Sequence, residues 1–112
     1  MYKGMGFGGN NMQMQNLMRQ AQKMQADMQN KMKQAEEELE NTTFTHTVGG
    51  GLVEIEMTGS KKIVDLRIKP EAVDPDDVEM LQDLLIVGIN DALSKADEME
   101  KNLKGGVTGG LF

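Results

Sequence analysis

The 112-residue sequence contains no cysteine, no tryptophan and a single histidine, His46. Without cysteine the chain forms neither a disulfide nor a thiolate metal site. Carboxylates then remain as metal ligands, but the acidic run at residues 74–79 lacks the spacing of a calcium loop, so we expect no metal and no cofactor. A catalytic nucleophile needs an adjacent base, and one histidine on an apolar strand face offers no such pair. The sequence therefore predicts a protein that is not an enzyme and has no small-molecule substrate.

Long apolar runs are also missing. Residues 1–9 lack the continuous apolar stretch of a signal peptide, and no segment approaches the roughly 20 apolar residues that span a membrane. The absence of cysteine suits a reducing compartment. These features predict a soluble, cytoplasmic protein with no membrane partner.

Negative charge dominates the chain but is unevenly distributed. The net charge is -6, which taken alone disfavours a polyanionic partner. Residues 1–35 nevertheless carry five basic side chains and one acidic side chain, a net charge of +4. Residues 36–112 carry seven basic and 17 acidic side chains, a net charge of -10. A solvated helix face is the alternative interpretation of this asymmetry.

Residues 11–41 contain neither glycine nor proline and predict one long helix. Their apolar residues recur with a mean step of about 3.6, which places them in one seam on one helix face. The seam consists of Met14, Leu17, Ala21, Met24, Met28, Met32, Ala35 and Leu39. Such a helix is roughly 45 Å long, more than a domain of this size covers, so part of it must project or meet a second chain.

Basic side chains lie on the opposite side of this helix. At about 100° per residue, Arg19, Lys23 and Lys33 fall within about 80° of one another. They form a stripe that faces solvent.

From residue 42 the apolar period changes to two, which predicts three half-buried strands. Their apolar faces carry Phe44, His46 and Val48, then Val53, Ile55 and Met57, then Val64, Leu66 and Ile68. Three glycines at 49–51 join the first two strands, and Gly59-Ser60 predicts a two-residue type II′ hairpin between the second and third. The short loops predict an antiparallel meander in the order 1-2-3, with one face that helices must cover.

The sequence Asp-Pro-Asp-Asp at residues 74–77 predicts the start of a second helix, with a capping aspartate and proline at the first helical position. An apolar seam follows, and the helix is expected to end near Gly105. The Gly-rich segments 1–10 and 105–112 are expected to be flexible arms. The prediction is an α+β fold, a two-layer α-β-β-β-α domain at residues 11–104.

The second helix is apolar nearly all round at residues 84–89. One small sheet covers only one side of a helix, so a second contact must bury the remainder. We expect Leu84, Ile86 and Val87 to lie in a homodimer interface, and Val87→Glu to give a monomer or an aggregate.

Five sequence segments, in this order along the chain, resemble the YbaB/EbfC family of bacterial nucleoid-associated proteins. They are MQNLMRQAQKMQADMQ (14–29), GGGLVEIEMTG (49–59), DPDDVEMLQDLL (74–85), NDAL (90–93) and TGGL (108–111). The resemblance implies an α-β-β-β-α fold, a homodimer whose helices project like tweezers, and binding of duplex DNA with little sequence specificity in the nucleoid. It implies no catalytic residues, and its DNA contacts do not transfer position by position.

The charge pattern therefore supplies the candidate contacts. We expect Arg19, Lys23 and Lys33 to contact phosphates, with Lys31 or Lys3 in support. Base-specific contacts should be few, because phosphate contacts carry no sequence information.

Two other classes remain open. A prefoldin-like chaperone has the same order of elements, and the apolar side chains of the two arms could hold clients. These are Met5, Phe7, Leu111 and Phe112. Prefoldins, however, need two long helices that form a hairpin with free tips. A dimeric scaffold that binds another protein through its acidic surface is the third class.

Overall fold

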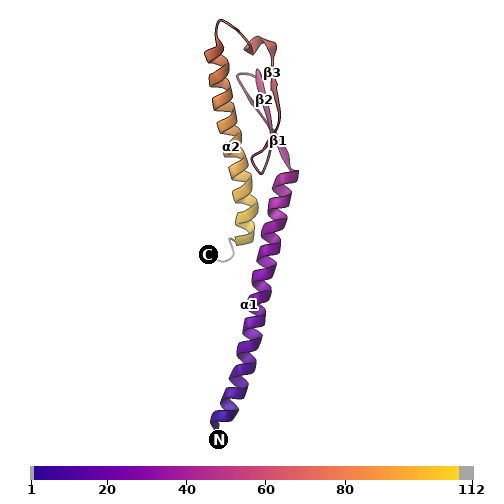
Figure 1. The fold of residues 1–112 in the computed structure, drawn as a ribbon, viewed down its shortest axis with the longest axis vertical. Coiled ribbons are helices and arrows are strands. Elements are labelled where there is room, and N and C mark those ends of the chain that lie inside the picture. Colours follow the sequence, from indigo (N-terminus) through magenta and orange to yellow (C-terminus); the bar gives the residue numbers. More distant parts are fainter. Residues whose placement is uncertain (1, 109–112) are drawn as a thin grey trace.

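The computed structural model describes the backbone of residues 2–108 and the side chains of residues 12–105. Helices and strands follow one another in the predicted α-β-β-β-α order (Figure 1). The elements are α1 (Tyr2–Asn41), β1 (Thr43–Val48), β2 (Val53–Thr58), β3 (Ile63–Ile68), a 3-10 turn η1 (Pro70–Ala72) and α2 (Val78–Thr108).

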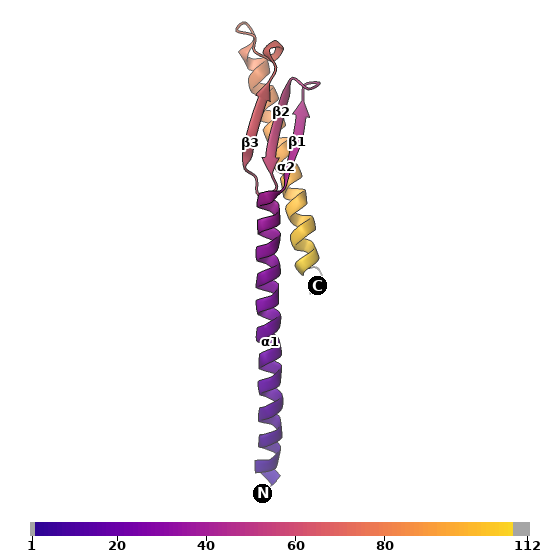
Figure 2. The same ribbon diagram turned by 90° about the vertical axis from the view of Figure 1, so that its right-hand side faces the viewer.

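Helix α1 is longer than the sequence predicts. It begins at Tyr2, so residues 2–10, for which the glycine content predicts neither helix nor strand, are helical. Each glycine costs a helix about 1 kcal/mol, but extending an existing helix avoids the larger cost of nucleation. The molecule is 93 Å long, and α1 runs far beyond the end of α2 (Figures 1 and 2). The prediction that part of this helix projects is confirmed.

The three strands form one antiparallel sheet in the predicted order β1-β2-β3. The β1–β2 turn contains the glycines at 49–51, and all three have positive φ. Residues other than glycine rarely adopt three such conformations in succession, so this turn requires its glycines.

The β2–β3 turn differs from the predicted two-residue type II′ turn. The N–H of Lys61 donates to the carbonyl of Thr58 at 3.0 Å, and Lys61 itself has a φ of 72°. The loop therefore has three residues, and its left-handed position is Lys61 instead of Gly59. Packing explains the glycine, because a Cβ at Gly59 would lie 2.8 Å from Cδ2 of Leu39 on α1.

Helix α2 begins at Val78, four residues after the predicted cap. Asp74 accepts a hydrogen bond from the N–H of Asp76 at 3.0 Å and so forms a turn before the helix. Asp77 accepts from the N–H of Met80 at 3.2 Å and is the capping residue. The proline thus belongs to the preceding turn, not to the first helical position.

At its other end α2 continues to Thr108, beyond the predicted end near Gly105. A side chain at Gly105 would meet open space, so neither close packing nor a positive φ ends the helix there. The rest of the predicted C-terminal arm, residues 109–112, lies outside the described residues.

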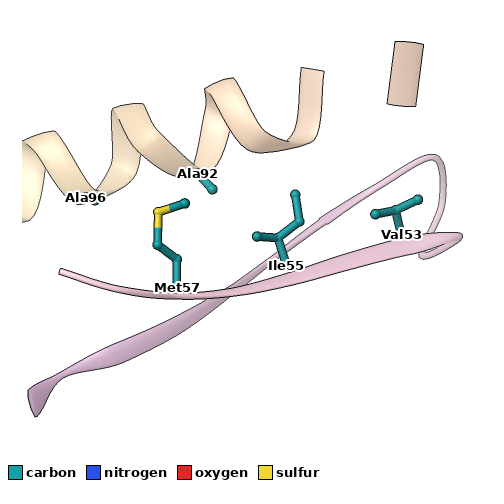
Figure 3. Close-up of a cluster of buried hydrophobic side chains, with 5 residues drawn as sticks. All are labelled: Val53, Ile55, Met57, Ala92 and Ala96. Atoms are coloured by element: carbon teal, nitrogen blue, oxygen red, sulfur yellow. The ribbon is translucent and has the colours of Figure 1, made fainter. Parts of the chain in front are cut away.

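The core lies between the sheet and α2. Figure 3 shows Val53, Ile55 and Met57 of β2 pointing toward the helix, where Ala92 and Ala96 face them. All five are fully buried. The two alanines keep the helix close to the central strand, as their small side chains require little space.

Gly88 allows the same close approach one turn earlier. A Cβ at this position would lie 2.9 Å from Cδ1 of Ile55 and 3.0 Å from Cγ2 of Val48. Real Cβ atoms essentially never come closer than 3.0 Å, so a larger residue here would push α2 away from the sheet.

Strand β3 is poorly covered in a single chain. Helix α2 packs mainly on β1 and β2 (Figure 2). Leu66 pairs with Ile55 and so shares its face of the sheet, yet Leu66 is 40% exposed, and Val64 is 54% exposed. The prediction that helices cover the apolar face of this strand is wrong for these two residues, because a helix about 10 Å across cannot cover three strands spaced about 4.8 Å apart.

The apolar seam of α1 divides into two halves. Ala35 and Leu39 are buried, and Met28 and Met32 are half-buried, where α1 packs against α2 and β2. All side chains from 12 to 27 are exposed. We call residues 12–27 the projecting segment and residues 34–108 the body, and residues 28–33 join the two.

Candidate nucleic-acid interface

Arg19, Lys23 and Lys33 all have exposed side chains on α1. Helical geometry separates the first and last by about 21 Å along the axis and keeps all three within about 80° around it. In the part of the chain that the structure describes, no ion pair involves any of them. These three residues, hereafter the basic stripe, form a row of free cations.

The two supporting lysines are not brought into this row. Lys31 is exposed but lies two residues before Lys33, hence about 200° away around the helix. The side chain of Lys3 lies outside the described residues. Neither residue is therefore placed beside the basic stripe.

Amide side chains extend the basic stripe, although the pattern of charges in the sequence does not predict them. Gln15 and Asn30 are exposed, and their spacing from Arg19 and Lys23 puts them on the same side of α1. Asparagine and glutamine donate hydrogen bonds to phosphate oxygens. Counting amides at helical spacing, together with charges, would have identified them.

Several basic residues of the body, by contrast, pair with carboxylates. Nζ of Lys61 lies 3.0 Å from Oδ1 of Asp97, and Nε of Arg67 lies 2.8 Å from Oε2 of Glu54. Further pairs join Arg67 to Asp65 and Glu56, Lys101 to Asp97, and Lys104 to Glu36 and Glu100. Their positive charge is thus largely neutralised before any polyanion approaches.

These pairs shift the proton affinities of their members. The hydrogen bond from Lys61 lowers the pKa of Asp97, and the Asp97 carboxylate raises the pKa of Lys61. Hydrogen bonds to Glu54 and then to Asp65 raise the pKa of Arg67. These directions favour the charged forms of Lys61, Arg67 and Asp97 at neutral pH.

A cavity of about 540 Å³ opens beside the N-terminal end of α2. Its lining includes Asp77, Glu79 and Asp83 together with Val48 and Val87. Three carboxylates repel phosphate, so this cavity is unsuitable for DNA. Within the described residues, no group of three histidine or carboxylate side chains is arranged to hold a metal ion.

His46 lies on β1 and faces α2. Its Nε2 is buried without a hydrogen-bond partner and lies 3.5 Å from Oδ2 of Asp91. Lys95, one turn further along α2, places its Nζ 6.0 Å from the ring centre of Phe44. These contacts hold the helix against β1.

The predicted dimer residues fall on different sides of α2. Leu84 packs against the core of its own chain and lies close to Gly49, where an added Cβ would be 2.9 Å from its Cδ2. Val87 is 53% exposed and borders the cavity near β1, whereas Ile86 is 58% exposed. Ile86 lies about 100° from Val87 around the helix. It is on the same side of α2 as Asp97, which pairs with Lys61 in the β2–β3 turn.

Helices in the described part of the chain are too polar or too short to cross a membrane.

Three comparisons relate this chain to known proteins. A nucleoid-associated protein of Ruminiclostridium cellulolyticum is 54% identical over 110 residues, which cover 98% of this chain and 90% of that protein. A nucleoid-associated protein of Clostridium acetobutylicum is 51% identical over 106 residues, covering 95% of this chain and 89% of that protein. The crystal structure of an uncharacterized protein from Helicobacter pylori superposes with a TM-score of 0.69 at 30% identity, covering 76% of this chain and 89% of that one.

A family model described as the YbaB/EbfC DNA-binding family matches residues 9–111, nearly the whole chain. The match includes all five segments that carried the resemblance in the sequence, and the fold has the element order that the resemblance implies. The chain therefore belongs to the YbaB/EbfC DNA-binding family.

Proposed function

We propose that this chain is a cytoplasmic, nucleoid-associated protein that binds duplex DNA through the basic stripe of α1. The observation that supports this proposal is the contrast between the cations of the stripe, which are free, and those of the body, many of which are paired. Binding DNA through Lys61 or Lys104 would require breaking an existing ion pair, whereas Arg19, Lys23 and Lys33 are available at no such cost.

Sequence specificity is expected to be low. The stripe lies along the side of a helix, and its charged side chains suit phosphate contacts better than the base edges of a groove. Counterion release then makes binding strongly dependent on salt.

The proposal includes a homodimer, which doubles the stripe. The proposed dimer interface is the side of the body where β3 remains uncovered, because exposed apolar side chains gather there. Leu66 and Ile63 lie on the exposed part of β3, and Ile86 lies on the flank of α2 that faces the β2–β3 turn. Apolar side chains of this size rarely stay exposed together unless a partner covers them.

The test is a shift assay with a labelled duplex and a variant in which Arg19, Lys23 and Lys33 are all alanine. For a dimer that neutralises roughly 4 to 6 phosphates, log K should fall against log salt with a slope of about -4 to -5. The triple variant should lose most of its affinity and most of this salt dependence, while remaining dimeric in light scattering.

The matched control is a triple variant of the body, with Lys61, Lys101 and Lys104 changed to alanine, which removes the same charge. Its DNA affinity should remain near that of the wild type. Undiminished binding by the stripe variant, or equal loss in both variants, would contradict the assignment of the site to α1.

The structure offers less support for a prefoldin-like chaperone. Such a chaperone needs two helices that project together as a hairpin, but here α1 projects alone beyond the end of α2 (Figure 1). An assay of client aggregation would separate the two classes, since a DNA-binding protein should not suppress it.

A further inference from the structure

The projecting segment has an apolar side that the basic stripe does not use. Here the seam of α1 continues with Met14, Leu17 and Met24, which are 61%, 64% and 60% exposed. Closer to the body the same seam is covered by α2, and Ala35 and Leu39 are buried. One continuous seam is thus covered by a helix over half its length and faces solvent over the other half.

The side chains that border the exposed half of the seam are mostly uncharged. At about 100° per residue, Gln13 and Gln20 lie on one border, together with one acidic residue, Asp27, and Gln22 and Gln29 lie on the other. In paired helices such border positions often carry the charges that select the partner. With one acidic side chain on these borders and the basic stripe on the opposite side, two copies of the same segment can approach with little like-charge repulsion.

We infer that the seam of the projecting segment packs against the same seam of a second copy that belongs to another dimer. The inference rests on the proposed function, since it takes the basic stripe as the DNA-binding surface. With two segments packed seam to seam, their stripes point outward in opposite directions. Each stripe then meets a different duplex, so the pair bridges two DNA molecules.

The contact between the segments is small. Each contributes Met14, Leu17, Ala21 and Met24, which bury less than the roughly 1,200 Å² of a stable interface. Pairing is therefore weak in free solution and strengthens when dimers are held close together on DNA. The dimer surface proposed on the body uses none of these residues.

Bridging can be measured as capture of a second duplex. A duplex fixed to beads is loaded with protein, washed, and offered a fluorescent duplex. The seam variant combines Leu17→Gln with Met24→Gln. Its matched control combines Val73→Gln with Val78→Gln, two exposed apolar residues that lie away from both the stripe and the seam. Both variants keep the charge of the wild type.

Wild type and control should capture the second duplex equally. The seam variant should capture it at least about tenfold less, because each pair of segments loses four apolar side chains from the contact. Its affinity for a single duplex should not change. Capture by the seam variant at the wild-type level overturns the inference, as does a wild type that binds the first duplex and captures no second. A wild type that binds no duplex at all contradicts the proposed function, and with it the bridge.

The cysteine-free sequence permits an independent measurement. Under mild oxidation, Leu17→Cys should crosslink chains into species larger than a dimer on native sizing, whereas Met12→Cys should not. Equal crosslinking by both variants overturns the inference. A Leu17→Cys product that runs only as a dimer places the contact within one dimer and overturns pairing between dimers.

Discussion

Helix α1 is exposed in the projecting segment but packed against other elements in the body. In the body, α1 buries Ala35 and Leu39 against α2, and nearby cations such as Lys104 pair with carboxylates. In the projecting segment every side chain is exposed, and Arg19 and Lys23 have no partner among the described residues. The body therefore provides folding stability, whereas the projecting segment provides surface for other molecules.

This division explains why an acidic chain can belong to a DNA-binding family. The excess of negative charge is concentrated in residues 36–112, where, among the described side chains, six of the 17 carboxylates pair with lysine or arginine. Because the projecting segment extends along a molecule 93 Å long, much of it lies beyond the screening length of about 8 Å from those charges. The electrostatic repulsion between the net negative charge and DNA thus acts mainly outside the projecting segment.

The largest contrast should appear in stability. Ile55→Ala removes a fully buried side chain and should cost about 3 kcal/mol, lowering the melting temperature by about 10–20 °C. Met24→Ala, in the projecting segment, should change stability by less than about 0.5 kcal/mol. Thermal denaturation followed by circular dichroism measures both. A comparable loss in the two variants would show that the segment is part of the folding unit.

The dimer surface should give the next largest effect. Ile86→Glu places a charge on the uncovered flank beside β3 and should weaken the dimer by about 2 kcal/mol or more, roughly thirtyfold in dissociation constant. Sedimentation velocity over a concentration series measures the change. Val87→Glu is the control because Val87 borders the cavity near β1. If Val87→Glu alone gives monomer, the interface lies on that side, as the sequence first suggested.

Most of the body could be predicted from the sequence because its signals are local. Alternation of apolar residues located three strands, and the order of the sheet followed from two short loops. Predictions failed where distant packing decided the outcome. The sequence predicts that Gly59 is needed for its turn conformation, but its missing side chain instead makes room for Leu39, twenty positions earlier in the chain. The exposure of Leu66 likewise depends on how far one helix extends across the sheet.

The candidate site was predictable in part. Helical spacing alone placed Arg19, Lys23 and Lys33 on one side of α1, and the structure keeps them there with exposed side chains. The sequence could not show that the alternative cations at Lys61 and Lys104 are paired, because their carboxylate partners are brought near by tertiary contacts. That pairing, and not net charge, distinguishes Lys61 and Lys104 from the basic stripe.

A single substitution in the basic stripe should sharpen the contrast in DNA binding. Lys23→Ala removes one phosphate contact per chain, so it should flatten the salt slope by up to about 2 in the dimer. Lys61→Ala removes the same charge from a cation that is already paired and should leave the slope unchanged. Fluorescence anisotropy over a salt series measures both slopes. Equal flattening would mean that the sheet end also touches DNA.

The smallest effect concerns the pH dependence of the paired cations. Hydrogen bonding to Lys61 lowers the pKa of Asp97 below its ordinary value of 3.8, so the stabilisation is present above that value and is lost as the pH falls through the folded pKa. The pKa of Lys61 is raised, so its contribution persists below 10.5 and is lost only at higher pH. Asp97→Asn should therefore lower the melting temperature slightly at neutral pH, and the difference from wild type should vanish in acid. Glu98→Gln removes a neighbouring charge for which the described residues show no ion pair, and it should leave the melting temperature unchanged at both pH values. A difference between Asp97→Asn and wild type that persists below the folded pKa would show that Asp97 stabilises α2 through packing and not through its charge.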